Sequence, residues 1–330
     1  MDISMQFQQM RHVVALVEKR SLASAAKALG ISQPALSKSL RRLETDLGVK
    51  LFERTARGVL ATEFGREFAR HARAIVVEVA EAERAVGAIR EGREGRIVIG
   101  SAPSVIASVL PIATARLLKG HSDLKVTVVG GLHDRLFEWL RSGELDVVIS
   151  NLVEQPDGSD LAQETLFVDR VVLACRPGHP LIGRRNYPKK EIDGYRWVLP
   201  ATTIVTRQHL EKALARQGLA PPRLAVETNS LSFMRAMIME TDCLGYIPAV
   251  TMAPNRECAG IVPAGVAWLD WHRPVGLTLR RSGELSPACR RLIAELRKVC
   301  TERFPGARMA TALKTGRSAA GRAADHHALI

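Results

Sequence analysis

A short segment near the N-terminus carries polar side chains whose types and spacing could bind DNA. Ser32 and Pro34 open a predicted helix in SQPALSKSLRRLE, residues 32–44, because serine caps helices and proline is tolerated in the first turn. One side of this helix is apolar and carries Leu36, Leu40, Leu43 and Leu47. The opposite side is polar and carries Pro34, Ser37, Lys38 and Arg41, with Gln33 exposed in the first turn.

The chemistry of the polar side suits the major groove of DNA. Gln33 and Ser37 can reach base edges, while Lys38 and Arg41 can hold phosphates. The alternative is an ordinary amphipathic helix with a solvated polar face, since charged faces are common. The preceding helix, its glycine turn and the basic loop downstream together favour DNA binding.

Two helices are predicted before this segment and would position it. Apolar residues recur at steps of three and four between residues 6 and 19, which indicates one buried helical face. Ser21 can cap the next helix, and Gly30 can supply the left-handed residue that ends it. Helix, turn and capped polar helix together predict a helix-turn-helix.

A long helix is predicted to follow, from Thr62 to Glu91. Its apolar residues alternate at steps of four and three, as in a heptad seam, and they are Phe68, Ala72, Ile75, Val79, Ala82, Val86 and Ile89. A helix packed on its own domain would favour a broader stripe. We therefore predict an intermolecular coiled coil that pairs two DNA-binding domains on two half-sites. Gly92 and Gly95 mark a hinge after it.

The segment SLASAAKALGISQPALSKSLRRLETDLGVKLFERTARGVLATEFG, residues 21–65, resembles the winged helix-turn-helix of LysR-type transcriptional regulators. The order of residues is long and specific, unlike a single short motif. The resemblance implies that Arg57, in the wing, contacts the minor groove or its phosphates. It also assigns five residues to the recognition helix: Ser32, Gln33, Pro34, Ser37 and Lys38.

After the hinge, predicted strands alternate with predicted helices. Strands are expected at 96–100, 124–129, 145–150, 170–177, 196–200, 223–228, 244–248 and 274–280. Helices are expected at 104–118, 132–143, 207–216, 230–240 and 286–303. This alternation predicts parallel sheets covered on both faces. The family resemblance, which covers roughly residues 7–304, implies two Rossmann-like subdomains with a cleft between them, as in periplasmic solute-binding proteins.

Candidate ligand-binding residues follow the predicted strands, because open parallel sheets bind ligands beyond the carboxyl ends of their strands. They are Ser101, Ser104, Thr202, Thr203 and Ser230. A hydroxyl beside free helix N–H groups suits a small anion, although each could instead cap only its own helix. Leu132 stands where the family often has a small hydroxyl residue, which disfavours an aromatic or simple dicarboxylate ligand.

Composition limits the class of protein. The chain has 330 residues, 46% of them hydrophobic, which predicts two or three compact units. A formal charge of +13 favours a polyanionic partner. No signal peptide or membrane span is recognisable, and five scattered cysteines without CxxC spacing fit a reduced cytoplasm.

These observations predict a division into four parts. Residues 5–62 would form an all-α winged helix-turn-helix, 63–94 a dimerisation helix and hinge, 95–304 an α/β effector-binding domain and 305–330 a disordered basic tail. The expected partners are double-stranded DNA, a second copy in a homodimer or homotetramer, RNA polymerase and a small effector.

We expect no metal, no cofactor besides the effector, and no catalysis, since GxSxG, HExxH, GxxxxGK and GxGxxG are absent. A cytosolic small-molecule-binding protein or an α/β enzyme without a role in transcription is the alternative.

Overall fold

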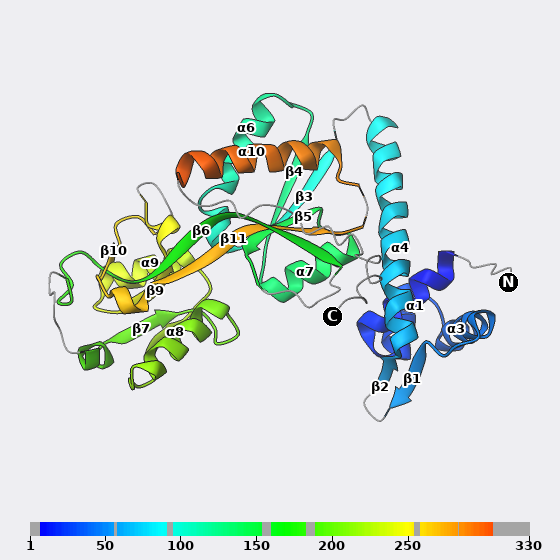
Figure 1. Ribbon diagram of the computed structural model, residues 1–330, viewed down its shortest axis with the longest axis horizontal. Coiled ribbons are helices and arrows are strands. Elements are labelled where there is room, and N and C mark those ends of the chain that lie inside the picture. Colours follow the sequence, from blue (N-terminus) through cyan, green and yellow to red (C-terminus); the bar gives the residue numbers. More distant parts are fainter. Residues whose placement is uncertain are drawn as a thin grey trace, which may run out of the picture.

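A helical unit, a long helix and an α/β domain follow one another in the computed structural model (Figure 1). The structure describes residues 7–55, 58–90, 95–153, 160–182, 189–253, 258–282 and 284–305. The predicted basic tail therefore lies outside the described residues from 306 onward. Among the described helices, none combines the length and the apolar character that crossing a membrane requires.

Three short helices and a hairpin make the N-terminal unit. The helices are α1 (Phe7–Lys19), α2 (Leu22–Leu29) and α3 (Gln33–Leu47). Both predicted caps are confirmed, since Ser21 Oγ accepts from Ser24 N and Ser32 Oγ accepts from Ala35 N at 3.3 Å. Gly30 adopts the left-handed conformation that ends α2, with φ of 68°. Buried leucines of α3 pack with α1 and α2 in one core.

The wing is a two-stranded antiparallel hairpin, so the unit is not entirely helical. Its strands are β1 (Phe52–Thr55) and β2 (Gly58–Ala61). The long helix α4 (Glu63–Arg90) begins directly afterwards, and Thr62 Oγ1 accepts from Gly65 N at 3.0 Å at its start. At 28 residues α4 matches the predicted length, and its first half packs against α1. Figure 1 shows α4 as the upright helix whose lower end lies in the helical unit.

The α/β domain is built on one nine-stranded sheet in the order β4-β3-β5-β11-β6-β9-β7-β8, with β10 beside β6. Its strands are β3 (Arg96–Ser101), β4 (Lys125–Gly130), β5 (Val147–Asn151), β6 (Leu161–Cys175), β7 (Arg196–Leu199), β8 (Arg223–Glu227), β9 (Leu244–Pro248), β10 (Val262–Pro263) and β11 (Trp271–Arg280). The first subdomain contains β3, β4 and β5, which pair in parallel, and the second contains β7, β8 and β9, which also pair in parallel.

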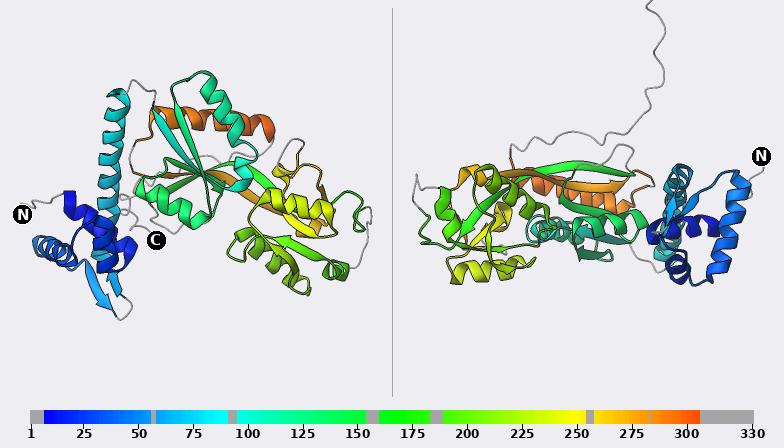
Figure 2. Two further views of the ribbon diagram at one scale, coloured as in Figure 1. Left: turned by 180° about the vertical axis from the view of Figure 1, so that it is seen from behind. Right: turned by 90° about the horizontal axis from the view of Figure 1, so that it is seen from below.

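The expectation of wholly parallel sheets is wrong at the middle of this sheet. Strands β6 and β11 pair antiparallel with each other and with their neighbours β9 and β5. Each is longer than the segment predicted for it, because each continues from one subdomain into the other. Figure 2 shows the two strands running together between the subdomains. These two strands connect the subdomains to each other.

Helices cover the sheet and enclose separate cores. They are α5 (Pro103–Ile106), α6 (Leu110–Lys119), α7 (His133–Ser142), α8 (Val205–Arg216), α9 (Leu231–Glu240) and α10 (Pro287–Arg303), with short 3-10 turns at Lys189–Gly194, Ala249–Thr251 and Ala267–Leu269. The single helix expected over 104–118 is divided into α5 and α6. Pro111 explains the break, because it lacks the N–H that would continue the first helix and instead occupies the first turn of the second.

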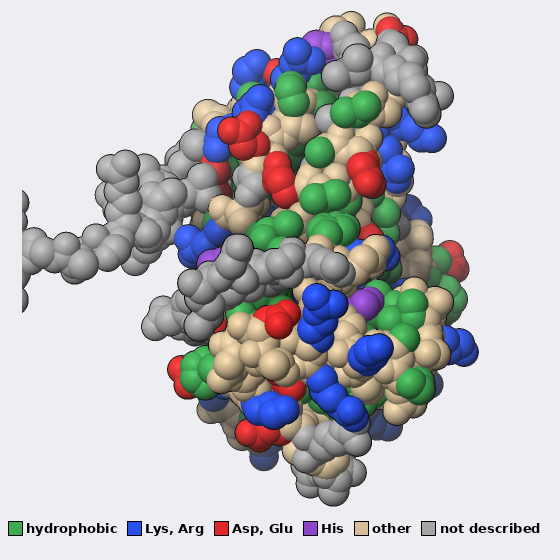
Figure 3. Space-filling model, turned by 90° about the vertical axis from the view of Figure 1, so that its right-hand side faces the viewer, with side chains coloured by type: hydrophobic (Ala, Val, Ile, Leu, Met, Phe, Trp, Pro, Cys, Tyr) green, Lys and Arg blue, Asp and Glu red, His purple; other side chains and the backbone are tan. Residues whose placement is uncertain are grey.

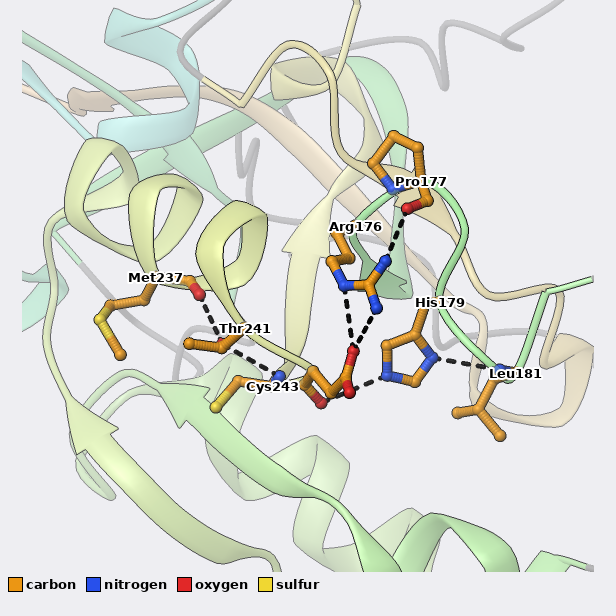
Figure 4. Close-up of polar contacts among 8 residues, drawn as sticks. Arg176, Pro177, His179, Leu181, Met237, Thr241 and Cys243 are labelled. Atoms are coloured by element: carbon orange, nitrogen blue, oxygen red, sulfur yellow. Dashed lines mark hydrogen bonds and ion pairs between the residues drawn. The ribbon is translucent and has the colours of Figure 1, made fainter.

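The turn after β6 is fixed by an ion pair and a buried histidine (Figure 4). Arg176 Nε and Nη2 donate to Asp242 Oδ1 at 3.0 and 2.7 Å. His179 Nδ1 accepts from Leu181 N at 3.1 Å, so its Nε2 carries the proton that is donated to the carbonyl of Asp242 at 3.2 Å. All five cysteines fall within the described residues, where they are buried and form no disulfide.

Candidate nucleic-acid interface and ligand cavity

The polar side of α3 is presented to solvent. Ser32, Gln33, Pro34, Lys38 and Arg41 are exposed, and Ser37 is half-buried. On the opposite side Leu36, Leu40 and Leu43 are buried. The core therefore fixes which side of α3 faces outward, and all the predicted α3 contacts share that side. Figure 3 shows Lys and Arg side chains on this part of the molecule, in its lower half.

The wing lies beside α3, but its tip falls outside the described residues. Arg57, the predicted minor-groove contact, is in that tip. The hairpin that carries it closes through the pair Thr55 and Gly58, and Thr55 Oγ1 donates to the carbonyl of Gly58 at 3.2 Å.

A carboxylate that the sequence reasoning missed links α3 to the wing. Glu44 Oε1 accepts from the backbone N–H groups of Leu51 and Phe52 at 2.8 and 3.2 Å. Its other oxygen pairs with the exposed Lys50 at 3.1 Å. The sequence does contain a signal for this contact. An acid in the last turns of a helix interacts unfavourably with the helix dipole, which suggests that its carboxylate binds another part of the chain. Glu44 holds the first strand of the wing at a fixed place relative to α3.

A second anchor joins the wing to the turn between α1 and α2. Val59 N donates to the carbonyl of Arg20 at 3.0 Å, and Arg20 has a positive φ of 50°. Gly58 has φ of 120°, and a Cβ at this residue would lie 2.6 Å from the same carbonyl oxygen. Glycine is required here by both backbone conformation and space.

The predicted seam on α4 divides into two parts. Phe68 packs against the core of the helical unit, and Ala72 is buried within the chain. Further along, Ile75, Val79 and Val86 are 42%, 36% and 67% exposed, and Ala82 is exposed too. The side chain of Ile89 is outside the described part of the chain. Figure 3 shows hydrophobic side chains gathered in a column over α4 in its upper half.

A cavity of about 270 Å³ lies between the two subdomains, beyond the carboxyl ends of several strands. Ser104 and Thr203 line it, and three other predicted residues do not. Ser101 is buried in the sheet, where its hydroxyl donates to the carbonyl of Ile149 at 3.1 Å. Thr202 is exposed outside the cavity, and Ser230 caps α9 by accepting from Phe233 N at 3.3 Å. Those three hydroxyls therefore lie away from the cavity.

Arg273 in β11 is the main cavity residue that sequence reasoning missed. In the antiparallel register it stands opposite Asp169 of β6, and Nη2 lies 3.1 Å from Asp169 Oδ2. The same nitrogen donates to Ser104 Oγ at 3.3 Å, and Nη1 donates to Thr206 Oγ1 at 3.2 Å. No local pattern in the sequence indicates this, because the pairing joins residues far apart in the chain.

His133 adds a second polar group to the cavity wall. Its Nε2 is buried without a hydrogen-bond partner among the described residues. Burial lowers the pKa of His133, with Asp134 opposing and Arg273 adding to that effect. Burial therefore favours the neutral form of His133.

Two family models match the chain. The model of the LysR substrate binding domain matches residues 66–301, and that of the bacterial regulatory helix-turn-helix protein, lysR family, matches residues 7–66. The chain belongs to the LysR family. It is a LysR-type transcriptional regulator with a DNA-binding helix-turn-helix and an effector-binding domain.

Named relatives agree with this membership. The HTH-type transcriptional regulator GbpR of Azospirillum brasilense is 34% identical over 307 residues, which cover 88% of this chain and 86% of that protein. The HTH-type transcriptional regulator PcaQ of Agrobacterium fabrum is 29% identical, covering 92% of this chain and 98% of that one.

Solved structures of LysR-type regulators share the fold. LysG from Corynebacterium glutamicum, solved with its effector arginine bound, superposes with a TM-score of 0.57 at 17% identity, covering 90% of this chain and 99% of that one. A full-length OxyR variant from Pseudomonas aeruginosa gives 0.56 at 20% identity, covering 92% and 97%.

Proposed function

We propose that this regulator binds double-stranded DNA as a homodimer or homotetramer and that a small anionic effector in the cavity controls the binding. The observation that carries the proposal is the outward side of α3, where an amide, a hydroxyl and cations stand together opposite buried leucines. Base edges are read by amides and hydroxyls, and phosphates are held by cations.

Within this proposal the α3 residues divide into two roles. Gln33 and Ser37 read bases, while Lys38 and Arg41 hold phosphates. Ser32 and Pro34 fix the start of the helix against the DNA backbone. Arg57 of the wing contacts the adjacent minor groove. The chain's charge of +13 supports an electrostatic contribution that does not depend on sequence.

Dimerisation through α4 is the second part of the proposal. Four apolar side chains on the part of α4 beyond the helical unit, at Ile75, Val79, Ala82 and Val86, recur at heptad steps and are exposed in the single chain. A second α4 would bury them in a coiled coil. The dimer would then present two α3 helices to two half-sites of one DNA site.

The remaining parts concern where and how the protein acts. We propose that the protein works in the cytoplasm, where bacterial DNA lies. We also propose that it holds DNA in one of two arrangements, and that a change from one arrangement to the other alters the access of RNA polymerase to the DNA. The proposal assigns the protein binding and no catalysis. Turnover assays set beside binding assays would distinguish the two.

Two matched substitutions on α3 test the DNA-reading proposal. Gln33→Ala should relax discrimination by about 1–3 kcal/mol against the best wrong base, because a base contact is lost. Lys38→Ala should weaken specific and random duplexes alike and reduce the slope of affinity against salt by about 1. If Gln33→Ala loses equal affinity for the specific and the random duplex, Gln33 does not read bases.

A further inference from the structure

The long helix α4 makes contacts on a second side, opposite its exposed apolar side chains. Val77 of α4 is only 6% exposed, and α4 contacts α7 of the first subdomain. Side chains two residues apart on an α-helix point to nearly opposite sides, because each residue turns the helix by about 100°. Val77 therefore points away from the exposed Ile75 and Val79. One side of α4 is left for a partner, and the opposite side lies against the chain's own α/β domain (Figure 1).

Val77 meets the backbone of the α/β domain at Gly143, the residue that ends α7. Gly143 has φ of 78°, a conformation that glycine adopts without strain. A Cβ at this residue would lie 3.0 and 3.2 Å from the two methyl carbons of Val77 and 3.5 Å from its Cβ. Glycine therefore lets α4 approach the end of α7 closely, with the valine side chain packed against it.

An arginine fixes the end of α7 from inside the α/β domain. Nη1 of Arg280 donates to the carbonyl oxygens of Leu140 and Leu145 at 2.8 and 2.6 Å. These two residues stand on either side of Gly143 in the sequence. Arg280 belongs to β11, one of the two strands that continue from one subdomain into the other. The position of Gly143 is therefore tied to a strand that both subdomains share.

Beside this contact, the junction between α4 and the α/β domain is small and acidic. It encloses a cavity of about 20 Å³, which has room for about one water molecule. Carboxylates from both sides line the cavity, with Glu78 on α4 and Asp146 and Glu284 on the α/β domain, and Arg280 offsets part of their charge. Like charges repel, so the apolar contact of Val77 works against this repulsion to keep the junction closed.

From these observations we propose that Val77 and Gly143 form a latch that opens and closes between α4 and the α/β domain, and that DNA binding is coupled to its state. Opening the latch exposes one valine side chain and relieves the repulsion between carboxylates, so the two states differ little in free energy.

The continuity of α4 explains how the latch reaches the DNA. The helix runs unbroken from the helical unit to Arg90, so a closed latch fixes the direction of the α/β domain relative to α3. DNA that binds one state better shifts the latch by the difference in its affinity for the two states. This inference rests on the proposed function, since it names a contact through which the α/β domain acts on DNA binding.

A pair of introduced cysteines tests whether the contact forms in the full-length protein. Disulfides join Cβ atoms about 3.5–4.5 Å apart. A Cβ at residue 143 would lie 3.5 Å from that of Val77, and Val77→Cys removes the methyl groups that would crowd it. Val77→Cys with Gly143→Cys should therefore form an internal disulfide in most molecules under mild oxidation. The five native cysteines are buried.

Glu83→Cys with Gly143→Cys is the matched control. Glu83 is exposed and lies more than one helical turn beyond Val77. Both variants carry the same cysteine at residue 143 and differ in the place of the second cysteine on α4. Peptide mapping under non-reducing conditions measures the cross-linked fraction. The contact is refuted if the first variant forms no internal disulfide, or no more of it than the control forms.

The variant with cysteines at residues 77 and 143 also measures the coupling. A duplex that the wild type selects from a random pool should change the rate of disulfide formation about three-fold or more. Coupling is reciprocal, so the oxidised variant should bind that duplex more tightly than the reduced one if the duplex speeds cross-linking, and more weakly if it slows it. Val77→Asp, which opens the latch without an oxidant, should change the affinity in the opposite sense to the disulfide. An unchanged rate and affinity, or changes whose senses disagree, overturn the coupling.

The same measurements separate this inference from the proposed function. If the wild type selects a duplex but neither the rate of cross-linking nor the affinity responds, the coupling is wrong and the DNA-binding proposal stands. If the wild type selects no duplex, the proposed function fails and the coupling fails with it, while the cross-link still decides whether the contact forms.

Discussion

Removing the Glu44 carboxylate should loosen the wing from the recognition helix α3. The carboxylate accepts two backbone bonds, from Leu51 N at 2.8 Å and from Phe52 N at 3.2 Å. A hydrogen bond to a charged group contributes about 1.5–3 kcal/mol, so two set an upper limit of about 3–6 kcal/mol. Phe52 is only half-buried, so water can replace part of its bond. For Glu44→Ala we therefore expect a loss of about 2–4 kcal/mol.

Two companion variants distinguish the backbone bonds from the ion pair. Glu44→Gln keeps an acceptor oxygen and should cost about 1–2 kcal/mol. Lys50→Ala removes only the ion pair, and Lys50 is 75% exposed, so its cost should stay below about 0.5 kcal/mol. The order of the three variants follows from which bonds each one removes.

Native-state hydrogen exchange reports the effect where it arises, at the amides of β1 and β2 in the full-length protein. In Glu44→Ala those amides should exchange faster, while amides of the α/β domain should stay as in wild type. DNA affinity should fall along with wing protection. The reasoning fails if Glu44→Ala loses no more protection in the hairpin than Lys50→Ala does.

Three further outcomes are expected. Gly58→Ala should destabilise the hairpin by about 1–3 kcal/mol, because its backbone conformation and the Arg20 carbonyl exclude a side chain; unchanged exchange in β2 would contradict this. Ile75→Asp with Val79→Asp should give a monomer in sedimentation. An unchanged mass would show that the exposed apolar residues of α4 do not hold the dimer together. Burial lowers the pKa of His179, so below about pH 6.5 the unfolded chain binds more protons and stability falls as pH drops toward the folded pKa. His179→Gln should flatten that fall across denaturant titrations from about pH 7 to pH 5, and an identical slope would refute it.

Local signals made the helical unit predictable. Ser32 accepts from the amide of Ala35, as its place before Pro34 indicates, and the leucine spacing of α3 determines which side is buried. The starting point and length of α4 were equally clear. These features depend on contacts within a few residues, which sequence patterns record directly.

Features that depend on distant pairing were not predictable in the same way. Arg273 and Asp169 meet because β6 and β11 pair antiparallel, and nothing near either residue indicates that register. The heptad spacing likewise did not show that Phe68 would pack against the core of the chain's own helical unit, or that Ala72 would be buried within the single chain. Spacing along one helix gives its apolar side but not the partner for each part of it.

The central claim is that α3 reads DNA sequence in a regulator that binds as a symmetric assembly. Selection of duplexes from a random pool by the purified full-length protein tests it most directly. Wild type should enrich two related half-sites whose centres lie about one helical turn, or a whole number of turns, apart. In the same selection Gln33→Ala should lose the preference for particular bases within both half-sites, while the spacing of the half-sites should stay the same. A pool that wild type leaves without any enriched sequence would contradict the claim.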